Sequence, residues 1–302
     1  METKCSFPRL WCAGIASSHV VNFFQILLLG IIQGAAELLP ISSSAHVIVA
    51  ERLLGLDPAT PEMTFMLVML HTGTMFAVIA YFWRAWGERF FSSAAAFQRI
   101  ILLVVIATGL TGVTGLVIQH LIEKAFLGNG DIEQLFSNLR LMAAALAAGG
   151  LLIICAGRAA ERGRPDRDLG WRSACWIGAV QGLCLPFRGF SRSGATISTG
   201  LLRGINKARM EEFSFALAVV LTPPVIGREL LRLLKARADA FHSLHVLPLI
   251  GPGVTGMVCS FGAGLLALKF LSRLLETGRW AFFGYYCLVA AAGVLILAAA
   301  GG

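Results

Sequence analysis

The sequence predicts an all-α integral membrane protein organised as an inverted-topology repeat, with one re-entrant helix hairpin and three transmembrane helices in each half. The chain has 302 residues, of which 57% are hydrophobic and 14% are charged, whereas soluble domains carry about 25% charged residues. Six stretches are apolar over the length of roughly 20 residues that a transmembrane helix needs. A polar motif rich in helix breakers and hydroxyls occurs twice in this apolar chain.

The six predicted transmembrane helices are separated by charged loops and fall into two groups of three. Their expected ranges are 64–83, 99–119, 139–157, 213–233, 246–270 and 280–299. We predict a single membrane domain with an N-terminal extension over residues 1–20, a first repeat over 21–157 and a second repeat over 158–302.

Two segments, 21–56 and 171–206, are predicted to be the re-entrant hairpins. Each consists of a short apolar stretch, a break rich in Pro, Gly and Ser, and a second short apolar stretch. Stretches of this length are too short to span a bilayer, and non-helical backbone at depth is tolerated only where it is buried in protein or lines a cavity. We therefore expect both breaks to face a cavity inside the protein.

The two hairpins belong to a duplication that extends into the helices after them. Ser42 and Ser191 are 149 residues apart. The same offset relates five further pairs: Ser44 and Ser193, Ile48 and Ile197, Leu53 and Leu202, Gly55 and Gly204, and Glu62 and Glu211. Because three spans follow each hairpin, the second half must enter the membrane from the opposite face. Such inverted repeats place their binding site near the midplane, where the two halves meet.

Basic residues predict the orientation of the chain. The larger set includes Arg84, Arg89, Arg99 and the arginines of 158–172, and loops rich in Lys and Arg stay on the cytoplasmic side. Both termini are then expected on the periplasmic side. These loops account for most of the net charge of +8. No basic run interleaved with aromatic residues predicts a nucleic-acid partner.

The first polar motif contains an ionisable residue at membrane depth. Glu37 follows Gln33 by four residues, so both side chains share one face of a helix. Glu37 could be a solvated carboxylate at a helix end. Its apolar neighbours favour a site instead, because ionisable groups at depth are expensive and usually functional.

Three hydroxyls and an imidazole follow Pro40. Ser42, Ser43 and Ser44 occupy the start of the next short helix, where one of them could simply cap the helix. The free N–H groups of the same helix start are also a phosphate-binding site. His46 lies four residues after Ser42 and three after Ser43, within reach of either hydroxyl. We therefore expect His46 to act as the base for a nucleophile or as an acid–base group.

The second polar motif places a guanidinium between two hydroxyls. Arg192 lies between Ser191 and Ser193 at the start of a short helix, an arrangement that suits a phosphate held by bidentate hydrogen bonds. Arg192 could instead pair with Glu37 and stabilise the interface between the repeats, and the two roles are compatible in an empty site. Arg188 could face the same phosphate or reach the headgroup region.

The two motifs carry a family resemblance. The stretch Gln33–His46 resembles the first signature of the bacitracin-resistance type undecaprenyl-diphosphate phosphatases, and Gly189–Thr196 resembles their second. The likeness covers nearly the whole chain after the N-terminal extension. It implies a phosphoric anhydride hydrolase of the bacterial plasma membrane that converts undecaprenyl diphosphate to undecaprenyl phosphate and phosphate. That reaction recycles the lipid carrier for peptidoglycan and other cell-wall polymers and confers bacitracin resistance. The resemblance also implies a homodimer whose site opens to the periplasm.

The resemblance implies a role for each motif residue. Glu37 would be the catalytic acidic residue and the ligand of a divalent cation, Mg²⁺ or Ca²⁺. Ser43 would be the nucleophile or a phosphate ligand, His46 the acid–base group and Arg192 the phosphate clamp. The substrate phosphate would also contact Gln33, Ser42, Ser44, Arg188, Ser191, Ser193 and Thr196.

The sequence departs from the family pattern at Gln33, where Glu is frequent, and Gln cannot be a charged metal ligand. It also has one additional residue beside Arg188, which places an extra cation near the site.

Two questions stay open at this stage. Either Ser43 attacks with His46 as its base, or a water molecule attacks after His46 and Glu37 position it. The alternative function is a flippase or transporter for polyprenyl phosphates, because paired re-entrant hairpins are also a transporter architecture.

Overall fold

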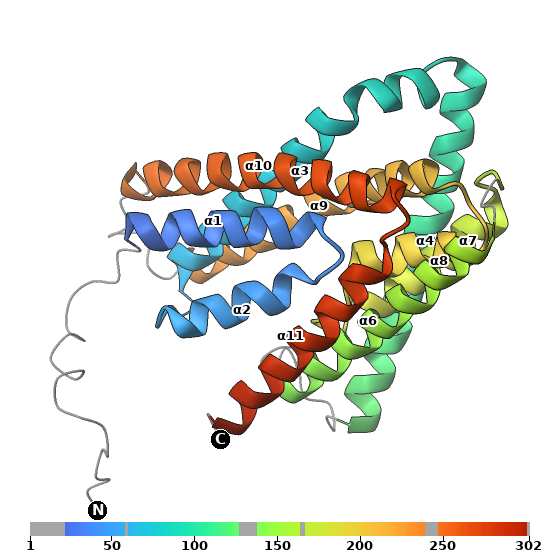
Figure 1. Cartoon of the computed structure of the whole chain (residues 1–302). Coiled ribbons are helices and arrows are strands. Elements are labelled where there is room, and N and C mark those ends of the chain that lie inside the picture. Colours follow the sequence, from blue (N-terminus) through green and yellow to red (C-terminus); the bar gives the residue numbers. More distant parts are fainter. Residues whose placement is uncertain (1–21, 58–59, 127–137, 164–166, 239–246, 301–302) are drawn as a thin grey trace, which may run out of the picture.

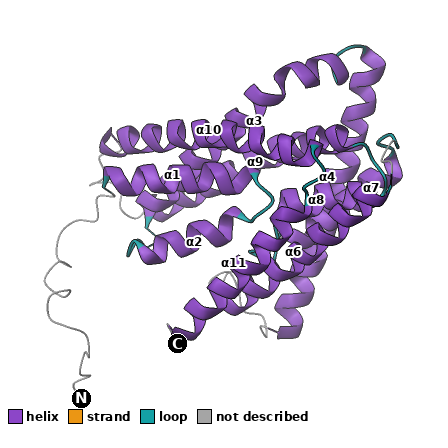
Figure 2. Ribbon diagram, in the orientation of Figure 1, coloured by secondary structure: helices purple, strands orange, loops and turns teal. Residues whose placement is uncertain are grey.

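A computed structural model gives the structure of residues 22–57, 60–126, 138–163, 167–238 and 247–300. Within these ranges the chain forms ten α-helices joined by loops, with one isolated β-bridge between Arg167 and Ile205 (Figure 2). The prediction of an all-α chain is therefore confirmed for the described residues. The N-terminal extension predicted over 1–20 lies outside them.

Six long helices match the six predicted spans. They are α3 (Pro61–Arg89), α4 (Ala94–Phe126), α6 (Leu139–Arg162), α9 (Lys207–Ala238), α10 (Leu247–Glu276) and α11 (Ala281–Ala300). Each contains a stretch long and apolar enough to cross a membrane. Several of these helices continue beyond the predicted ranges, because long charged side chains at a helix end can keep their heads in water while their stems cover apolar surface.

Two pairs of short helices lie where the hairpins are predicted. The first pair is α1 (Phe23–Leu38) and α2 (Ser43–Leu53), and the second is α7 (Trp171–Cys184) and α8 (Arg192–Leu202) (Figure 1). Pro40 follows α1 and cannot donate a helical hydrogen bond. Gly189 precedes α8 with a φ of 110°, a conformation that glycine adopts without steric cost. Each pair is therefore divided by backbone that cannot continue a helix.

The first short helix of each pair packs against a long helix from the other half of the chain. α1 lies along α10, and α7 lies along α4 (Figure 1). A Cβ atom added at Gly34 would lie 2.5 Å from the backbone oxygen of Ser260 on α10. A Cβ atom added at Gly182 would lie 2.7 Å from the backbone oxygen of Thr111 on α4. In both places glycine permits a close approach of two backbones, as small residues do between membrane helices.

Further contacts between the halves bring the two breaks together. Phe82 on α3 stacks on Phe215 on α9, with ring centroids 5.4 Å apart, and α6 lies beside α11 (Figure 1). The hydroxyl of Ser193 at the start of α8 donates to the carbonyl of Leu39 after α1, at 3.3 Å. The end of α1 and the starts of α2 and α8 therefore meet at one place inside the protein.

Candidate functional site

The carboxylate of Glu37 is the centre of a polar cluster formed by both halves. Its Oε2 accepts hydrogen bonds from the Ser43 hydroxyl at 2.6 Å and the Gln33 amide at 3.3 Å. Its Oε1 accepts from Nη2 of Arg192 at 3.1 Å. The Glu37 side chain is only 17% exposed and that of Arg192 only 21%. Because a buried charge is tolerated only when it is paired and hydrogen-bonded, this network explains how Glu37 is held in an apolar surrounding.

Arg192 has hydrogen-bonding capacity beyond its pair with Glu37. Its Nη1 atom is buried and has no hydrogen-bond partner among the described residues. Buried donors are nearly always satisfied, so such an atom indicates a group that the structure does not contain. A guanidinium presents a planar fork of N–H groups that matches phosphate oxygens. The free side of Arg192 is therefore a candidate anion-binding position beside Glu37 and Ser43.

The serines around the two helix starts differ in role. Ser42 and Ser44 have hydroxyl oxygens 3.2 Å apart, and Ser191 and Ser193 have theirs 3.4 Å apart, so the two motifs share this pairing. The Ser191 hydroxyl caps α8 by accepting from the N–H of Gly194 at 3.2 Å. Capping, which was considered for the serines of the first motif, thus occurs at Ser191 of the second motif. It does not occur at Ser42, whose side chain makes no cap hydrogen bond.

The backbone at Ser42 is strained. Its φ of 69° is positive, the only such value at a described residue other than glycine. Backbone in this region costs of order 1–3 kcal/mol and persists only where the surrounding structure enforces it. The conformation turns the chain so that α2 starts directly at Ser43. The free N–H groups of this helix start, at which anions bind readily, are thereby placed beside the cluster.

His46 faces away from the Ser43 hydroxyl. Its Nδ1 lies 2.8 Å from the carbonyl oxygen of Ser42, and since a carbonyl only accepts, Nδ1 carries the proton. Its Nε2 lies 2.7 Å from the hydroxyl of Tyr286 on α11, and the two rings stack. His46 therefore contacts Ser42, as its spacing predicts, but it bonds to the backbone carbonyl of Ser42 and not to the hydroxyl. Ser43 bonds to Glu37 instead.

His71 on α3 is a site residue that the sequence analysis missed. Its Nε2 lies 3.9 Å from Oε2 of Glu37, and its Nδ1 donates to the carbonyl of Leu67 at 2.9 Å. His71 is an ionisable residue inside the predicted span 64–83, and this position alone could have marked it as a candidate functional residue. Tyr286 had no comparable signal, because a tyrosine in a membrane helix is common near the interface.

Two predicted phosphate ligands lie outside the cluster. Thr196 is fully buried in α8, where its hydroxyl donates to the Arg192 carbonyl at 2.9 Å and lies 2.6 Å from the hydroxyl of Ser214. Arg188 is exposed, and its charge acts on the buried carboxyl of Glu51 in α2. The structure therefore brings Gln33, Glu37, Ser43 and Arg192 together, whereas Thr196 hydrogen-bonds within α8 and to α9.

An apolar cavity of about 410 Å³ opens beside His46. It lies between α2, α6 and α11, and its walls include Ala45, Val49, Leu146, Ala290 and Val294. The imidazole is the polar boundary of this cavity. An apolar chain fits such a cavity, because all of its walls except His46 are apolar.

Six membrane-length helices around a partly buried cluster of a carboxylate, a guanidinium and a serine hydroxyl define a multi-pass membrane protein. A family model described as bacitracin resistance protein BacA matches residues 26–293. The chain belongs to the bacitracin resistance protein BacA family.

Several relatives of this chain share most of its length. An undecaprenyl-diphosphatase 2 from Acinetobacter baylyi is 56% identical over 93% of this chain and 100% of its own length. An undecaprenyl-diphosphatase 1 from Burkholderia pseudomallei is 34% identical over 89% of this chain and 95% of its own. An undecaprenyl-diphosphatase from Halothermothrix orenii is 30% identical over 92% of this chain and 99% of its own.

Proposed function

We propose that this chain is an undecaprenyl diphosphatase, which hydrolyses undecaprenyl diphosphate to undecaprenyl phosphate and phosphate. The names of its relatives support this activity. In the bacterial plasma membrane the reaction would return the lipid carrier to peptidoglycan synthesis, and bacitracin resistance is the property for which the family is named. The observation that carries the proposal is the unpartnered Nη1 of Arg192 beside the Ser43–Glu37 hydrogen bond.

The substrate binds with its two parts in different surroundings. The terminal phosphate accepts hydrogen bonds from Arg192 and from the N–H groups at the starts of α2 and α8, which stabilise the charge that develops during phosphoryl transfer. The polyprenyl tail lies in the apolar cavity beside His46. Ser42, Ser44, Ser191, Ser193 and Gln33 are further proposed phosphate contacts, and each of their side chains also makes a hydrogen bond within the protein.

The hydrogen bond of 2.6 Å from Ser43 to Glu37 favours the serine route. Ser43 Oγ attacks the terminal phosphorus, its proton passes to Glu37, and the bond to the bridging oxygen breaks to release the lipid monophosphate. Water then hydrolyses the phosphoserine and releases phosphate. A nucleophile next to a base is the usual arrangement for such a step. The lipid monophosphate leaves as an anion. His46 lies at the cavity side of the site, where its Nε2 accepts from the Tyr286 hydroxyl.

The serine route is tested by trapping. Substrate labelled on the terminal phosphate should leave acid-stable phosphoserine on the wild-type chain after a rapid quench, and none on Ser43→Ala. Turnover of Ser43→Ala near the wild-type rate would assign the attack to water instead.

A divalent cation, Mg²⁺ or Ca²⁺, is a further proposal from the resemblance. The cluster contains one carboxylate, Glu37, whose two oxygens already accept protein hydrogen bonds. In the described ranges no three His, Cys, Asp or Glu side chains gather to hold a metal. Glu37 would thus hold the cation with at most one further such side chain, and the phosphate oxygens of the substrate would supply most of the coordination. We expect phosphate release to fall with a chelator and return with Mg²⁺. Release unaffected by the chelator would remove the cation from the proposal.

We also propose the inverted repeat, with its two re-entrant hairpins, and the division into repeats at residue 157. The matching contacts of Gly34 with α10 and Gly182 with α4 support it.

The orientation in the membrane is proposed from the basic residues at the ends of α3, α6 and α10. These residues support a cytoplasmic location for those helix ends, a periplasmic opening for the site and periplasmic termini. Labelling of single cysteines in intact cells would test this orientation, and crosslinking in membranes would test the homodimer.

The activity is tested with purified protein in detergent and undecaprenyl diphosphate. We expect phosphate release that Arg192→Ala and His46→Ala abolish and that Arg158→Ala, an exposed arginine on α6, leaves unchanged. Vectorial movement of the lipid in liposomes without phosphate release would instead favour the flippase or transporter alternative. Turnover near wild type in Arg192→Ala would contradict the site assignment.

A further inference from the structure

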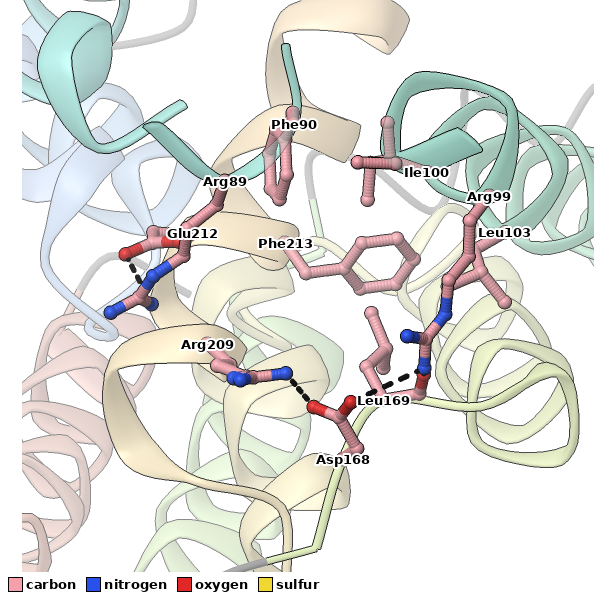
Figure 3. Close-up of a pocket in the computed structure, with 11 residues that line it drawn as sticks. Arg89, Phe90, Arg99, Ile100, Leu103, Asp168, Leu169, Arg209, Glu212 and Phe213 are labelled. Carbon is pink, nitrogen blue, oxygen red and sulfur yellow. Dashed lines mark hydrogen bonds and ion pairs between the residues drawn. The ribbon is translucent and has the colours of Figure 1, made fainter. Parts of the chain in front are cut away.

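A second polar cluster lies away from Glu37, in a pocket of about 220 Å³ (Figure 3). The end of α3, the start of α4, the segment before α7 and the start of α9 form its walls. Its charged residues are Arg89, Arg99, Asp168, Arg209 and Glu212. None of them contacts the Glu37 cluster, and the proposed reaction does not use them.

Positive charge is in excess at one end of this pocket. A single carboxylate, that of Asp168, pairs with two guanidiniums, those of Arg99 and Arg209 (Figure 3). Arg99 also donates to the backbone carbonyl of Leu169 at 2.9 Å. The side chains of Arg99 and Arg209 are about half exposed, so N–H groups on both remain open to a ligand. Two guanidiniums that share one carboxylate are suited to a phosphate.

At the other end of the pocket, one carboxylate oxygen of Glu212 has no hydrogen-bond donor among the described residues. The Glu212 side chain is only 7% exposed, and its Oε1 accepts from Nη1 of Arg89 at 2.8 Å (Figure 3). Its Oε2 is buried and has no partner among the residues that the structure describes. A buried carboxylate oxygen without a partner indicates a missing donor, because leaving such a group unsatisfied is costly. An ammonium group is the donor with the matching charge.

The two ends are close enough for one small ligand. Arg209 and Glu212 are three residues apart on α9, so their side chains are neighbours on the helix surface. Ile100 and Phe213 supply apolar wall between the charged groups. Basic pockets between membrane helices on the cytoplasmic side bind lipid headgroups, and this pocket lies among the arginines that the sequence predicts on that side.

We infer that this pocket binds a phosphodiester that carries a primary ammonium, the headgroup of a zwitterionic phospholipid such as phosphatidylethanolamine. The phosphate meets Arg99 and Arg209, and the ammonium donates to Glu212. The acyl chains follow the exposed apolar face of α4, which includes Ile101, Leu102 and Val105. The site is separate from the proposed phosphatase site, so its occupancy can be measured whether or not the chain hydrolyses diphosphates.

The test uses the delipidated full chain in detergent and native mass spectrometry. Phosphatidylethanolamine, phosphatidylcholine and phosphatidylglycerol with identical acyl chains are titrated in parallel. We expect phosphatidylethanolamine to bind about ten-fold more tightly than phosphatidylcholine, whose quaternary ammonium has no N–H to donate to Glu212. Equal binding of these two lipids, or tighter binding of phosphatidylglycerol, would overturn the inference. Tighter binding of soluble phosphoethanolamine than of the lipid would overturn the assignment to a lipid.

Two variants locate the binding. Arg99→Gln should weaken phosphatidylethanolamine binding about ten-fold, by loss of a charged hydrogen-bond partner. Arg162→Gln, at an exposed arginine that ends α6, is the matched control and should bind like wild type. Glu212→Gln should remove the preference over phosphatidylcholine. Should Glu212→Gln fail to fold, Arg99→Gln still decides, because Arg99 is exposed. Equal affinities in Arg99→Gln and Arg162→Gln would refute the site.

Discussion

Replacing Arg192 with lysine separates the two functions of its guanidinium. In the structure Nη2 donates to Glu37 at 3.1 Å, while Nη1 is buried without a partner and is proposed to donate to the substrate phosphate. Lysine keeps the charge but has a single nitrogen, which cannot occupy both positions. One hydrogen bond to a charged group is lost, worth about 1.5–3 kcal/mol. At about 1.36 kcal/mol for each factor of ten, kcat/KM should fall about 10- to 150-fold.

The assay is phosphate release from undecaprenyl diphosphate at substrate concentrations well below KM. Arg158→Lys, whose wild-type guanidinium donates to Tyr285 at 3.1 Å on the protein surface, is the control and should keep the wild-type kcat/KM. A kcat/KM of Arg192→Lys within about two-fold of wild type would refute the argument that the guanidinium bonds Glu37 and the substrate phosphate at the same time. A lower unfolding temperature with an unchanged kcat/KM would mean that Arg192 only stabilises the contact between the two halves of the chain.

Three further variants test contacts that only the structure revealed. Tyr286→Phe removes the hydroxyl bonded to His46 at 2.7 Å and should lower kcat/KM about three- to ten-fold, whereas an unchanged value would make that bond irrelevant to turnover. His71→Ala removes the imidazole 3.9 Å from the cluster carboxylate and should lower phosphate release about ten-fold; wild-type release would exclude His71 from the site. Gly34→Ala forces a Cβ atom into the backbone of α10 and should lower the free energy of unfolding by about 1–3 kcal/mol. Gly112→Ala, which meets open space, should keep the wild-type Tm, and equal Tm values for both glycine variants would contradict this packing argument.

The membrane helices could be predicted because length and apolarity alone define them. The range predicted as 139–157 begins at the first residue of α6, where the Asn138 side chain caps the helix. The ends of α3 and α4 could not be predicted, because Arg89 and Lys124 lie in their last turns and hydropathy ends a span at its charged residues. The start of α2 at Ser43 could be predicted, because Pro40 breaks the preceding helix and the three serines mark the start of the next one.

Only the site residues that lie within the two polar motifs could be predicted from the sequence. The pair of Glu37 and Arg192 was weighed from the sequence because each lies beside a helix break, and the structure places them 3.1 Å apart. The spacing of four residues correctly brought His46 to Ser42, but it could not distinguish the carbonyl from the hydroxyl of that serine. His71 approaches Glu37 from α3 and Tyr286 approaches His46 from α11, and no local sequence pattern records such contacts.

The glycine contacts of α1 and α7 have a consequence for how the protein is made. Gly34 needs the backbone of Ser260, which follows more than two hundred residues later. At about 5–20 residues per second, α1 waits on the order of ten seconds or more before its partner α10 is synthesised. Gly182 on α7 meets Thr111 on α4, a helix already made when α7 leaves the ribosome. α7 can therefore pack against α4 as soon as it is synthesised, whereas α1, which precedes Ser43 and carries Glu37, can pack against α10 only late in synthesis.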